Sequence, residues 1–411
     1  MSKKQISVGL DVGTSNVRVI VAKYNERDDK PQIIGVGQAF SSGMRRGAVV
    51  DIEEVVKSIR QAVKQAEQTS GVPIEHVLVS VGDCQITSRP SKGVIAVSRA
   101  DGEISKEDIR RVIEASRAIS LPPNREIIHV IPRSFTIDGQ EMIKDPEGMN
   151  GVRLEVDTLL IEGSIPFIKN LTKCINLAGL DIDDLVVSPI AASQAVLTKR
   201  QKELGVLALD IGGGTVGLTV FEEGNIIHSQ VLPIGASHIT NDIAIGLKTS
   251  IDVAERVKLE YGSVLPNEIN KKEVVDLSKL EGEEGMVPRR HIAEIIEARM
   301  SEILDLVNKE LKKIDRQALL PGGIVLVGGG AKTPGLIDLT KKTLALPVQI
   351  GFPTEIEGLV DKVDDPSFAT AVGLIKPQFF DQKDIRENVS ERKSLSQIGF
   401  KIKKWLKGFL P

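Results

Sequence analysis

Short apolar runs separated by glycine-rich turns recur along the chain, a pattern typical of strands in a mixed α/β fold. In residues 6–21 an Asp-x-Gly-Thr turn separates two such runs. Residues 207–220 repeat the same order of apolar run, Asp-x-Gly turn, hydroxyl residue and apolar run. Each stretch predicts a β-hairpin, and the repeat predicts two related halves that offer their hairpins to one ligand from opposite sides.

Helical spacing of apolar residues predicts several helices around these hairpins. One begins after Asp51, a good N-cap, and ends at Gly71, and others cover residues 251–261 and 289–313.

Two segments rich in small residues, 188–197 and 368–374, flank the second half. They predict a pair of helices that cross closely and connect the halves, although either one alone would read as an ordinary alanine-rich helix.

Residues 84–162 interrupt this rhythm. They contain their own strand patterns at 93–97, 127–135 and 153–161 and a helix capped by Ser105, and therefore predict an inserted small α+β subdomain. The predicted domains are 1–83 with 163–188 for the first half, 84–162 for the insert, and 189–376 for the second half, whose smaller subdomain is expected at 237–318.

Composition mainly excludes functions. A chain of 411 residues is too long for one compact core. Its aromatic content of 3% argues against base stacking, and its net charge of −3 gives no basic field, so we expect no nucleic-acid partner. Cys84 and Cys174 predict reduced packing residues, since no CxxC pair or histidine cluster accompanies them. Without a signal sequence or a long apolar run, the protein is expected to be cytoplasmic.

The residue types in the two hairpin turns suit phosphate binding. A carboxylate such as Asp11 can order the water shell of Mg²⁺, while the glycines let backbone N–H groups approach an anion. A third glycine turn follows a buried-looking strand at residues 324–327 and would let a base or ribose lie close to the backbone. For either hairpin alone, an ordinary β-turn is the simpler interpretation; the second copy favours a phosphate site.

The last 35 residues differ from everything before them. Residues 377–394 are polar and charged, which predicts a flexible tether, and residues 395–411 predict an amphipathic helix without acidic residues. A helix docked on the protein's own surface is the alternative, but the tether and the lysines favour an anionic membrane surface. The predicted apolar face consists of Leu395, Ile398, Ile402, Trp405, Leu406, Phe409 and Leu410, and the flanking lysines are Lys401, Lys403, Lys404 and Lys407.

Taken in order between residues 6 and 376, the two Asp-x-Gly hairpins and the late Gly-Gly-Gly turn resemble the superfamily of actin, sugar-kinase and heat-shock-chaperone ATPases. The resemblance implies an α/β, actin-like ATPase fold in which two Ribonuclease-H-like halves close around a nucleotide cleft, with the small α+β subdomain inserted.

The superfamily resemblance also implies the ligands ATP and Mg²⁺ and the residues that hold them. Asp11 and Asp210 would be the catalytic pair and hold the hydrated metal. Glu255 and Lys258 would reach the ribose, although a solvated ion pair is the alternative for them. The remaining contacts to phosphates and nucleoside are implied for Gly13, Thr14, Ser15, Asn16, Arg18, Gly212, Gly213, Gly214, Thr215, Gly329 and Gly330.

The fold, the insert after the first βββα unit and the tethered helix together resemble the FtsA family of bacterial cell-division proteins. This resemblance covers the whole chain. It implies a peripheral protein on the cytoplasmic side of the cell membrane at the division site, which forms filaments and has at most slow ATPase activity. Its implied partners are other copies of itself, the C-terminal tail of FtsZ, which is the tubulin-like division polymer, and other division proteins.

The helix predicted at residues 289–313 is where we expect the FtsZ tail to bind. Arg290 and Arg299 lie beside an apolar stripe and could offer a groove and a positive rim to a short acidic peptide. An ordinary core helix with a solvated face is the alternative.

Other members of the superfamily remain alternatives. A PilM-like pilus-assembly ATPase shares the fold and the insert but usually ends at the core. A small-molecule kinase needs a substrate-side carboxylate base, which the sequence does not reveal. MreB-like filaments lack the insert, and an ATP-driven chaperone needs a further peptide-binding domain. The tether and the helix favour the FtsA family over each of these.

Overall fold

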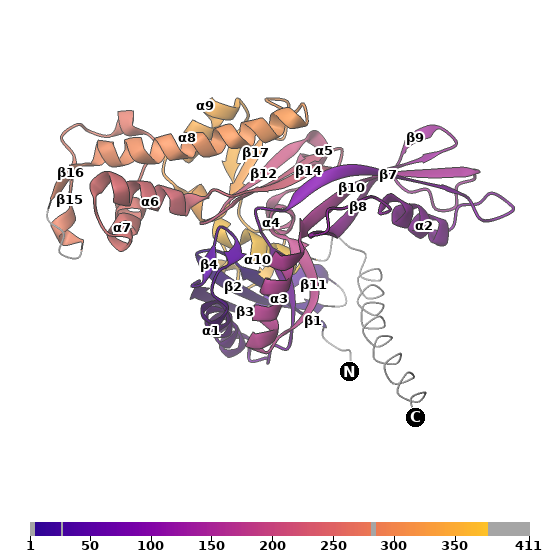
Figure 1. Ribbon diagram of the computed structural model, residues 1–411, viewed down its shortest axis with the longest axis horizontal. Helices are drawn as coiled ribbons and strands as arrows, with labels where there is room; N and C mark the ends of the chain where they lie inside the picture. Colours follow the sequence, from indigo (N-terminus) through magenta and orange to yellow (C-terminus); the bar gives the residue numbers. More distant parts are fainter. Residues whose placement is uncertain (1–4, 26–27, 281–284, 377–411) are drawn as a thin grey trace.

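The computed structural model describes residues 5–25, 28–280 and 285–376. The predicted tether and the predicted membrane helix lie outside the described residues. Figure 1 shows the first half below, the second half above it, and the insert projecting sideways. The insert points away from the smaller subdomain, which is formed by α6 (Ala236–Leu247), α7 (Ile251–Tyr261) and α8 (Arg289–Lys313).

Two sheets with one strand order form the halves. The order is β3-β2-β1-β6-β11 in the first half and β14-β13-β12-β17-β18 in the second. In both sheets the first three strands are antiparallel and the others parallel. The repeated topology confirms the predicted Ribonuclease-H-like halves. The strands are β1 Gln5–Val12, β2 Asn16–Asn25, β3 Asp28–Phe40, β6 His76–Val81, β11 Asp181–Val187, β12 Val206–Ile211, β13 Val216–Glu222, β14 Asn225–Leu232, β17 Ile324–Val327 and β18 Val348–Ile350.

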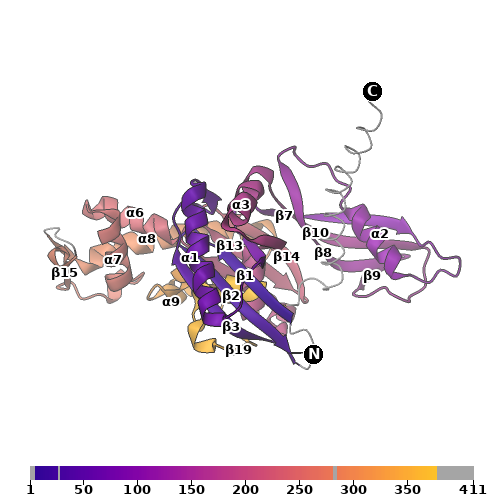
Figure 2. The ribbon, with the colours of Figure 1, turned by 90° about the horizontal axis from the view of Figure 1, so that it is seen from below.

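Helices cover the outer faces of both sheets. Helix α1 shows how local sequence sets such a helix: the Asp51 side chain accepts a hydrogen bond from the Glu54 N–H, and Gly71 ends the helix at φ 69°. Figure 2 shows α1 lying across the first sheet. The covering helices are α1 Ile52–Ser70, α3 Ile165–Ala178, α6 Ala236–Leu247, α8 Arg289–Lys313 and α9 Leu336–Leu344, while α5 Lys199–Leu204 contacts β13 and α7 Ile251–Tyr261 packs on α6 and α8.

The helices α4 (Ser188–Val196) and α10 (Ala369–Leu374) lie between the two halves. Their residues share one hydrophobic core with the inner faces of both sheets. They cross so closely that a Cβ at Gly373 would collide with the Ala191 carbonyl. The predicted pair of crossing helices is therefore present.

One strand crosses the predicted boundary between the halves. Residues 357–358 fall within the range predicted for the second half, but they form the short strand β19 (Glu357–Gly358), which was not predicted and which pairs in parallel with β3 at the edge of the first sheet. Its pairing depends on a distant partner, and a strand this short has no hydrophobic pattern of its own.

The insert forms a separate four-stranded sheet of order β7-β10-β8-β9 with α2 packed on it. Its helix begins at Ser105, which forms the predicted cap as part of a capping box with Asp108. The hairpin strand β9 was not predicted. The elements are β7 Thr87–Ala96, α2 Lys106–Ser116, β8 Arg125–Ile137, β9 Gln140–Ile143 and β10 Arg153–Ser164; two small hairpins elsewhere are β4 Met44–Arg45 with β5 Ala48–Val49, and β15 Val274–Asp276 with β16 Met286–Pro288.

Two hydrogen bonds, one buried and one partly buried, join the insert to both halves. Nε2 of the buried His129 in β8 accepts a hydrogen bond from the Val187 N–H, next to the start of α4, at 3.3 Å. On the other side, Ser88 Oγ in β7 accepts a hydrogen bond from the Ser229 N–H in β14 at 3.0 Å. The insert is therefore attached to β11 of the first sheet, at the residue before α4, and to β14 of the second sheet.

Candidate nucleotide-binding site

The two predicted hairpins are present and face each other. Their turns close in the same way, by a hydrogen bond from the Gly13 N–H to Asn16 O and from the Gly212 N–H to Thr215 O. A Cβ at Gly214 would lie 2.5 Å from Thr14 Oγ1, and one at Gly213 would collide with Ser15 Oγ. Glycine at these positions is therefore what lets the two turns meet.

Asp11 and Asp210 lie behind the turns, each with one hydroxyl donor. Ser80 Oγ donates to Asp11 at 2.6 Å, and Thr370 Oγ1 donates to Asp210 at 3.2 Å. Burial raises the pKa of Asp11. Burial, followed by the nearby charge of Asp11, raises the pKa of Asp210 to about 6. Two desolvated carboxylates of like charge favour a bound cation.

Arg18 lies opposite Asp11 in the β1–β2 pair and supplies a positive charge. Its guanidinium stacks over the Phe368 ring at 5.2 Å. Burial lowers the pKa of Arg18, and the charges of Asp11, Asp365 and Asp210 oppose that change. Its Nε is buried and has no hydrogen-bond partner in the described part of the chain. The structure thus places the predicted basic residue beside both carboxylates.

The third glycine turn lies against the second hairpin. A Cβ at Gly328 would collide with Asp210 Oδ1, and one at Gly330 would collide with the Ile211 side chain. By contrast, a Cβ at Gly329 would meet nothing within 4 Å. The turn therefore contacts the carboxylate on one side and borders open space on the other.

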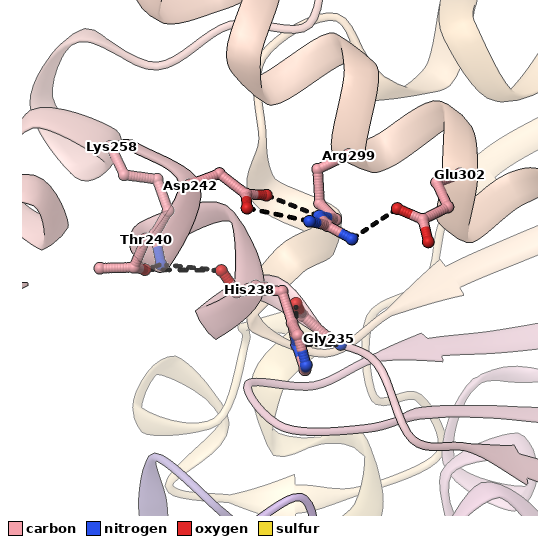
Figure 3. Close-up of polar contacts among 8 residues, drawn as sticks. Gly235, His238, Thr240, Asp242, Lys258, Arg299 and Glu302 are labelled. Carbon is pink, nitrogen blue, oxygen red and sulfur yellow. Dashed lines mark hydrogen bonds and ion pairs between the residues drawn. The ribbon is translucent and has the colours of Figure 1, made fainter. Parts of the chain in front are cut away.

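Lys258 and Glu255 form an ion pair beside the start of α6, and Figure 3 shows Lys258 next to Thr240 of that helix. Lys258 Nζ lies 2.6 Å from Glu255 Oε2 and donates to Thr240 Oγ1 at 2.8 Å. The pair is not fully solvated, since the Lys258 side chain is 15% exposed. The Ala236 and Ser237 N–H groups at the start of α6 donate to the Gly212 and Gly213 carbonyls, which connects this pair to the second hairpin.

Arg290 and Arg299 lie on α8, away from the hairpins. Arg299 makes two hydrogen bonds to Asp242 of α6, at 2.6 and 2.9 Å, and one to Glu302 (Figure 3). Arg290 contacts Glu294 and Asn267, each at 3.2 Å. Five apolar residues were expected beside them as a groove. Four of these, Ile292, Ile296, Met300 and Ile303, are fully buried in the core, and Ile295 is partly buried against it, so they do not line a surface groove. Helical periodicity cannot distinguish a core stripe from a groove.

Sequence reasoning missed Ser80, Thr370 and the turn between β4 and β5. Ser80 had a detectable signal, because it is the polar residue in the apolar run of β6, the strand parallel to β1. Thr370 had none, since its contact to Asp210 spans 160 positions.

Comparison with known proteins identifies the family. The family described as "Cell division protein FtsA" matches residues 207–373, and the "SHS2 domain inserted in FTSA" matches residues 84–162. The cell division protein FtsA of Bacillus subtilis is 41% identical over 377 residues, which cover 92% of this chain and 84% of that protein. The FtsA of Pseudomonas aeruginosa is 34% identical over 408 residues, covering 98% and 97%. The chain belongs to the FtsA family.

Solved structures show the same actin-like ATPase fold for this FtsA-family chain. The PilM–PilN type IV pilus biogenesis complex matches with a TM-score of 0.65 and 19% identity, covering 90% of this chain and 97% of that chain. MreB 5 of Spiroplasma citri bound to AMPPNP matches with a TM-score of 0.52 and 15% identity, covering 95% and 99%. No helix among the described residues has both the length and the apolar composition needed to cross a membrane.

The raised pKa of Asp210 leads to a prediction about stability. The pKa of Asp210 is about 6 in the folded chain, whereas the ordinary value for an aspartate, as in the unfolded chain, is 3.8. The folded chain therefore holds the proton more tightly, and protonation of Asp210 at low pH stabilises the fold. That contribution is lost as the pH rises from about 4 to about 6. Asp210→Asn should therefore raise the free energy of unfolding at pH 7.5, by on the order of 2 kcal/mol, in metal-free and nucleotide-free buffer.

Chemical denaturation at pH 7.5 and pH 4.5 measures the effect, with Asp305→Asn on the exposed side of α8 as the matched control. The gain should shrink at pH 4.5 and should be absent in the control. Equal stability of Asp210→Asn and the unchanged protein at pH 7.5 would contradict the prediction.

Proposed function

We propose that this chain binds Mg-ATP between its halves and assembles into actin-like filaments that attach the FtsZ polymer to the cytoplasmic face of the cell membrane at the division site. One observation carries the nucleotide part: two glycine hairpins meet in front of the desolvated carboxylates Asp11 and Asp210. A hydrated Mg²⁺ fits such a pair, since carboxylates bind it through its water shell. The nucleotide in the MreB structure, which has the same fold, supports this assignment.

Each predicted residue then has a position along the nucleotide. The hairpin residues Gly13, Thr14, Ser15, Asn16, Gly212, Gly213, Gly214 and Thr215 face the phosphates, and Arg18 balances the charge of the carboxylates. Gly329 and Gly330 border the nucleoside, and Glu255 with Lys258 lies toward the ribose. These parts position phosphates, and we expect at most slow hydrolysis, coupled to assembly.

Loss of the Asp210 charge should have opposite effects on nucleotide binding and on the stability of the fold. Asp210→Asn should weaken Mg-ATP binding at least roughly tenfold, because it removes half of the negative charge that holds the hydrated metal. Displacement of a fluorescent ATP analogue measures the affinity, and Asp305→Asn should bind normally. Unchanged Mg-ATP affinity in Asp210→Asn would refute the cleft assignment.

The membrane part of the proposal rests on the sequence after residue 376. Seven apolar side chains and four lysines of residues 395–411 occupy opposite faces of the predicted helix. The alignment with the Pseudomonas aeruginosa protein covers 98% of the chain and so continues into this segment. One such helix binds weakly, and a filament presents many of them.

Membrane binding should require both faces of this helix. Trp405→Glu with Phe409→Glu should abolish sedimentation with anionic liposomes, because charges cannot enter the acyl boundary without a cost of several kcal/mol (~2–3 per residue). Replacing Lys401, Lys403, Lys404 and Lys407 by Gln should instead weaken binding to anionic vesicles selectively and remove most of its salt dependence.

A chain that ends at Lys393 is the control for the membrane test. Mg-ATP should increase the sedimentation of the full-length chain with liposomes, and it should not increase the sedimentation of the shortened chain. If the shortened chain still sedimented with liposomes, the tail would not be the anchor.

The smaller subdomain, with α8 at its surface, is the proposed FtsZ site. Arg290 is 34% exposed and makes single contacts, so it is available to an acidic peptide. Arg299 is engaged in two hydrogen bonds to Asp242 of α6 and therefore holds two helices together as well. A charge reversal at Arg299 alone would therefore not distinguish a direct contact with the peptide from loss of the link between α6 and α8.

Variants at these positions should separate direct binding from support. Arg290→Glu should weaken binding of an FtsZ C-terminal peptide at least roughly tenfold, whereas Arg200→Glu on the exposed side of α5 should not. The exchange Arg299→Asp with Asp242→Arg restores the pair between α6 and α8. Peptide binding by the exchanged variant, measured by fluorescence anisotropy, should remain weak if Arg299 contacts the peptide. Normal binding by Arg290→Glu would remove this face of α8 from the proposal.

A further inference from the structure

The β4–β5 hairpin places its own turn at the point where the two proposed phosphate hairpins meet. Its two-residue turn is Arg46–Gly47. The Gly47 N–H donates to Thr14 Oγ1 at 3.0 Å, and a Cβ at Gly47 would lie 2.5 Å from the Gly82 carbonyl and 3.2 Å from Thr215 Cγ2. The turn therefore touches the first hairpin, the second hairpin and the end of β6.

The backbone of this turn is unusual for its sequence. Both residues have positive φ, 50° for Arg46 and 77° for Gly47. Two-residue turns of this kind favour Asn or Gly at the first position, because a long side chain there is strained. Strained residues of this type cluster at functional sites, where the side chain has a use that compensates for the strain.

The charge of Arg46 has no partner within the described ranges. Arg46 is exposed and forms no ion pair with a described carboxylate. The other cation behind the hairpins, Arg18, already faces Asp11, Asp210 and Asp365. Arg46 lies beside the second hairpin, because a Cβ at Gly214 would come within 3.0 Å of the Arg46 Cα. Arg46 therefore adds an unbalanced positive charge next to both phosphate turns.

The position of the turn selects one end of the phosphate chain. The start of α6, with Lys258 beside it, contacts the Gly212 and Gly213 carbonyls. The Arg46–Gly47 turn contacts the other end of the same hairpin: a Cβ at Gly214 would lie 3.0 Å from the Arg46 Cα. If the ribose lies toward Lys258, the far end of the hairpin receives the terminal phosphate.

We propose that Arg46 binds the terminal phosphate of the nucleotide and makes the site prefer a nucleoside triphosphate to a diphosphate. This inference rests on the proposed nucleotide function. A guanidinium suits this role, since it can donate two hydrogen bonds to one phosphate group. Arg46 would then be the residue through which the β4–β5 hairpin responds to the presence of that phosphate.

Binding of Mg-ATP and Mg-ADP, measured side by side by calorimetry, tests the proposal. Arg46→Gln should weaken Mg-ATP binding roughly tenfold or more, which is the typical effect of losing a hydrogen bond between charged groups. Its Mg-ADP affinity should stay within about twofold of the unchanged protein. Arg45→Gln, the exposed neighbour on β4, is the matched control and should bind both nucleotides normally.

Arg46→Gly separates the side chain from the turn, because glycine adopts positive φ without strain. It should fold normally and reproduce the loss of Mg-ATP preference. Normal binding of both nucleotides by Arg46→Gln, or an equal loss of both, would overturn the assignment while leaving the nucleotide site intact. Failure of the unchanged protein to bind either nucleotide would instead refute the proposed function, and this inference with it.

Discussion

The approach of two like charges, Asp11 and Asp210, is the constraint around which the rest of the structure is arranged. Each carboxylate lies on the strand before its hairpin turn, and the two come from different halves. The two charged carboxylates do not favour this approach by themselves, since burial disfavours the charged form and raises the pKa of both. What holds them is the core between the sheets, where α4 and α10 cross at Ala191 and Gly373 and pack against both inner faces. The fold thus carries an electrostatic cost that a bound cation would relieve.

Helix α6 connects this cleft to the smaller subdomain. Its first N–H groups hold the Gly212 and Gly213 carbonyls of the second hairpin. Further along α6, Thr240 contacts the Glu255–Lys258 pair of α7. Asp242, also on α6, accepts hydrogen bonds from Arg299 of α8. The helix that carries the proposed partner site, α8, is therefore connected to the second hairpin by two sets of hydrogen bonds, both made by α6.

Local signals explain what the sequence could predict. The hairpins, the Asp51 and Ser105 caps and the bounds of α7 and α8 depend on neighbouring residues, and the structure has them where the pattern placed them. Ser80, Thr370, β19 and the Arg46–Gly47 turn acquire their roles from contacts with distant parts of the chain. The apolar stripe of α8 was ambiguous for a different reason: one period describes both a core face and a groove, and only the packing of α6 and the second sheet against it decides.

The insert is connected to the same helix from the opposite side. Ser88 Oγ accepts the Ser229 N–H, so its proton is free to be donated to His228 Nδ1 at 3.1 Å. The neutral ring then carries its proton on Nε2, which faces Glu310 of α8 at 3.4 Å, and burial lowers the pKa of His228 and so favours this neutral form. Glu310 in turn pairs with Lys313 at 2.7 Å. Strand β14 therefore links the insert to the C-terminal part of α8, and α6 links the two hairpins to the middle of α8. The insert and the smaller subdomain lie at opposite ends of the molecule (Figure 2), so α8 is the element on which the contacts from the insert and from the hairpins meet.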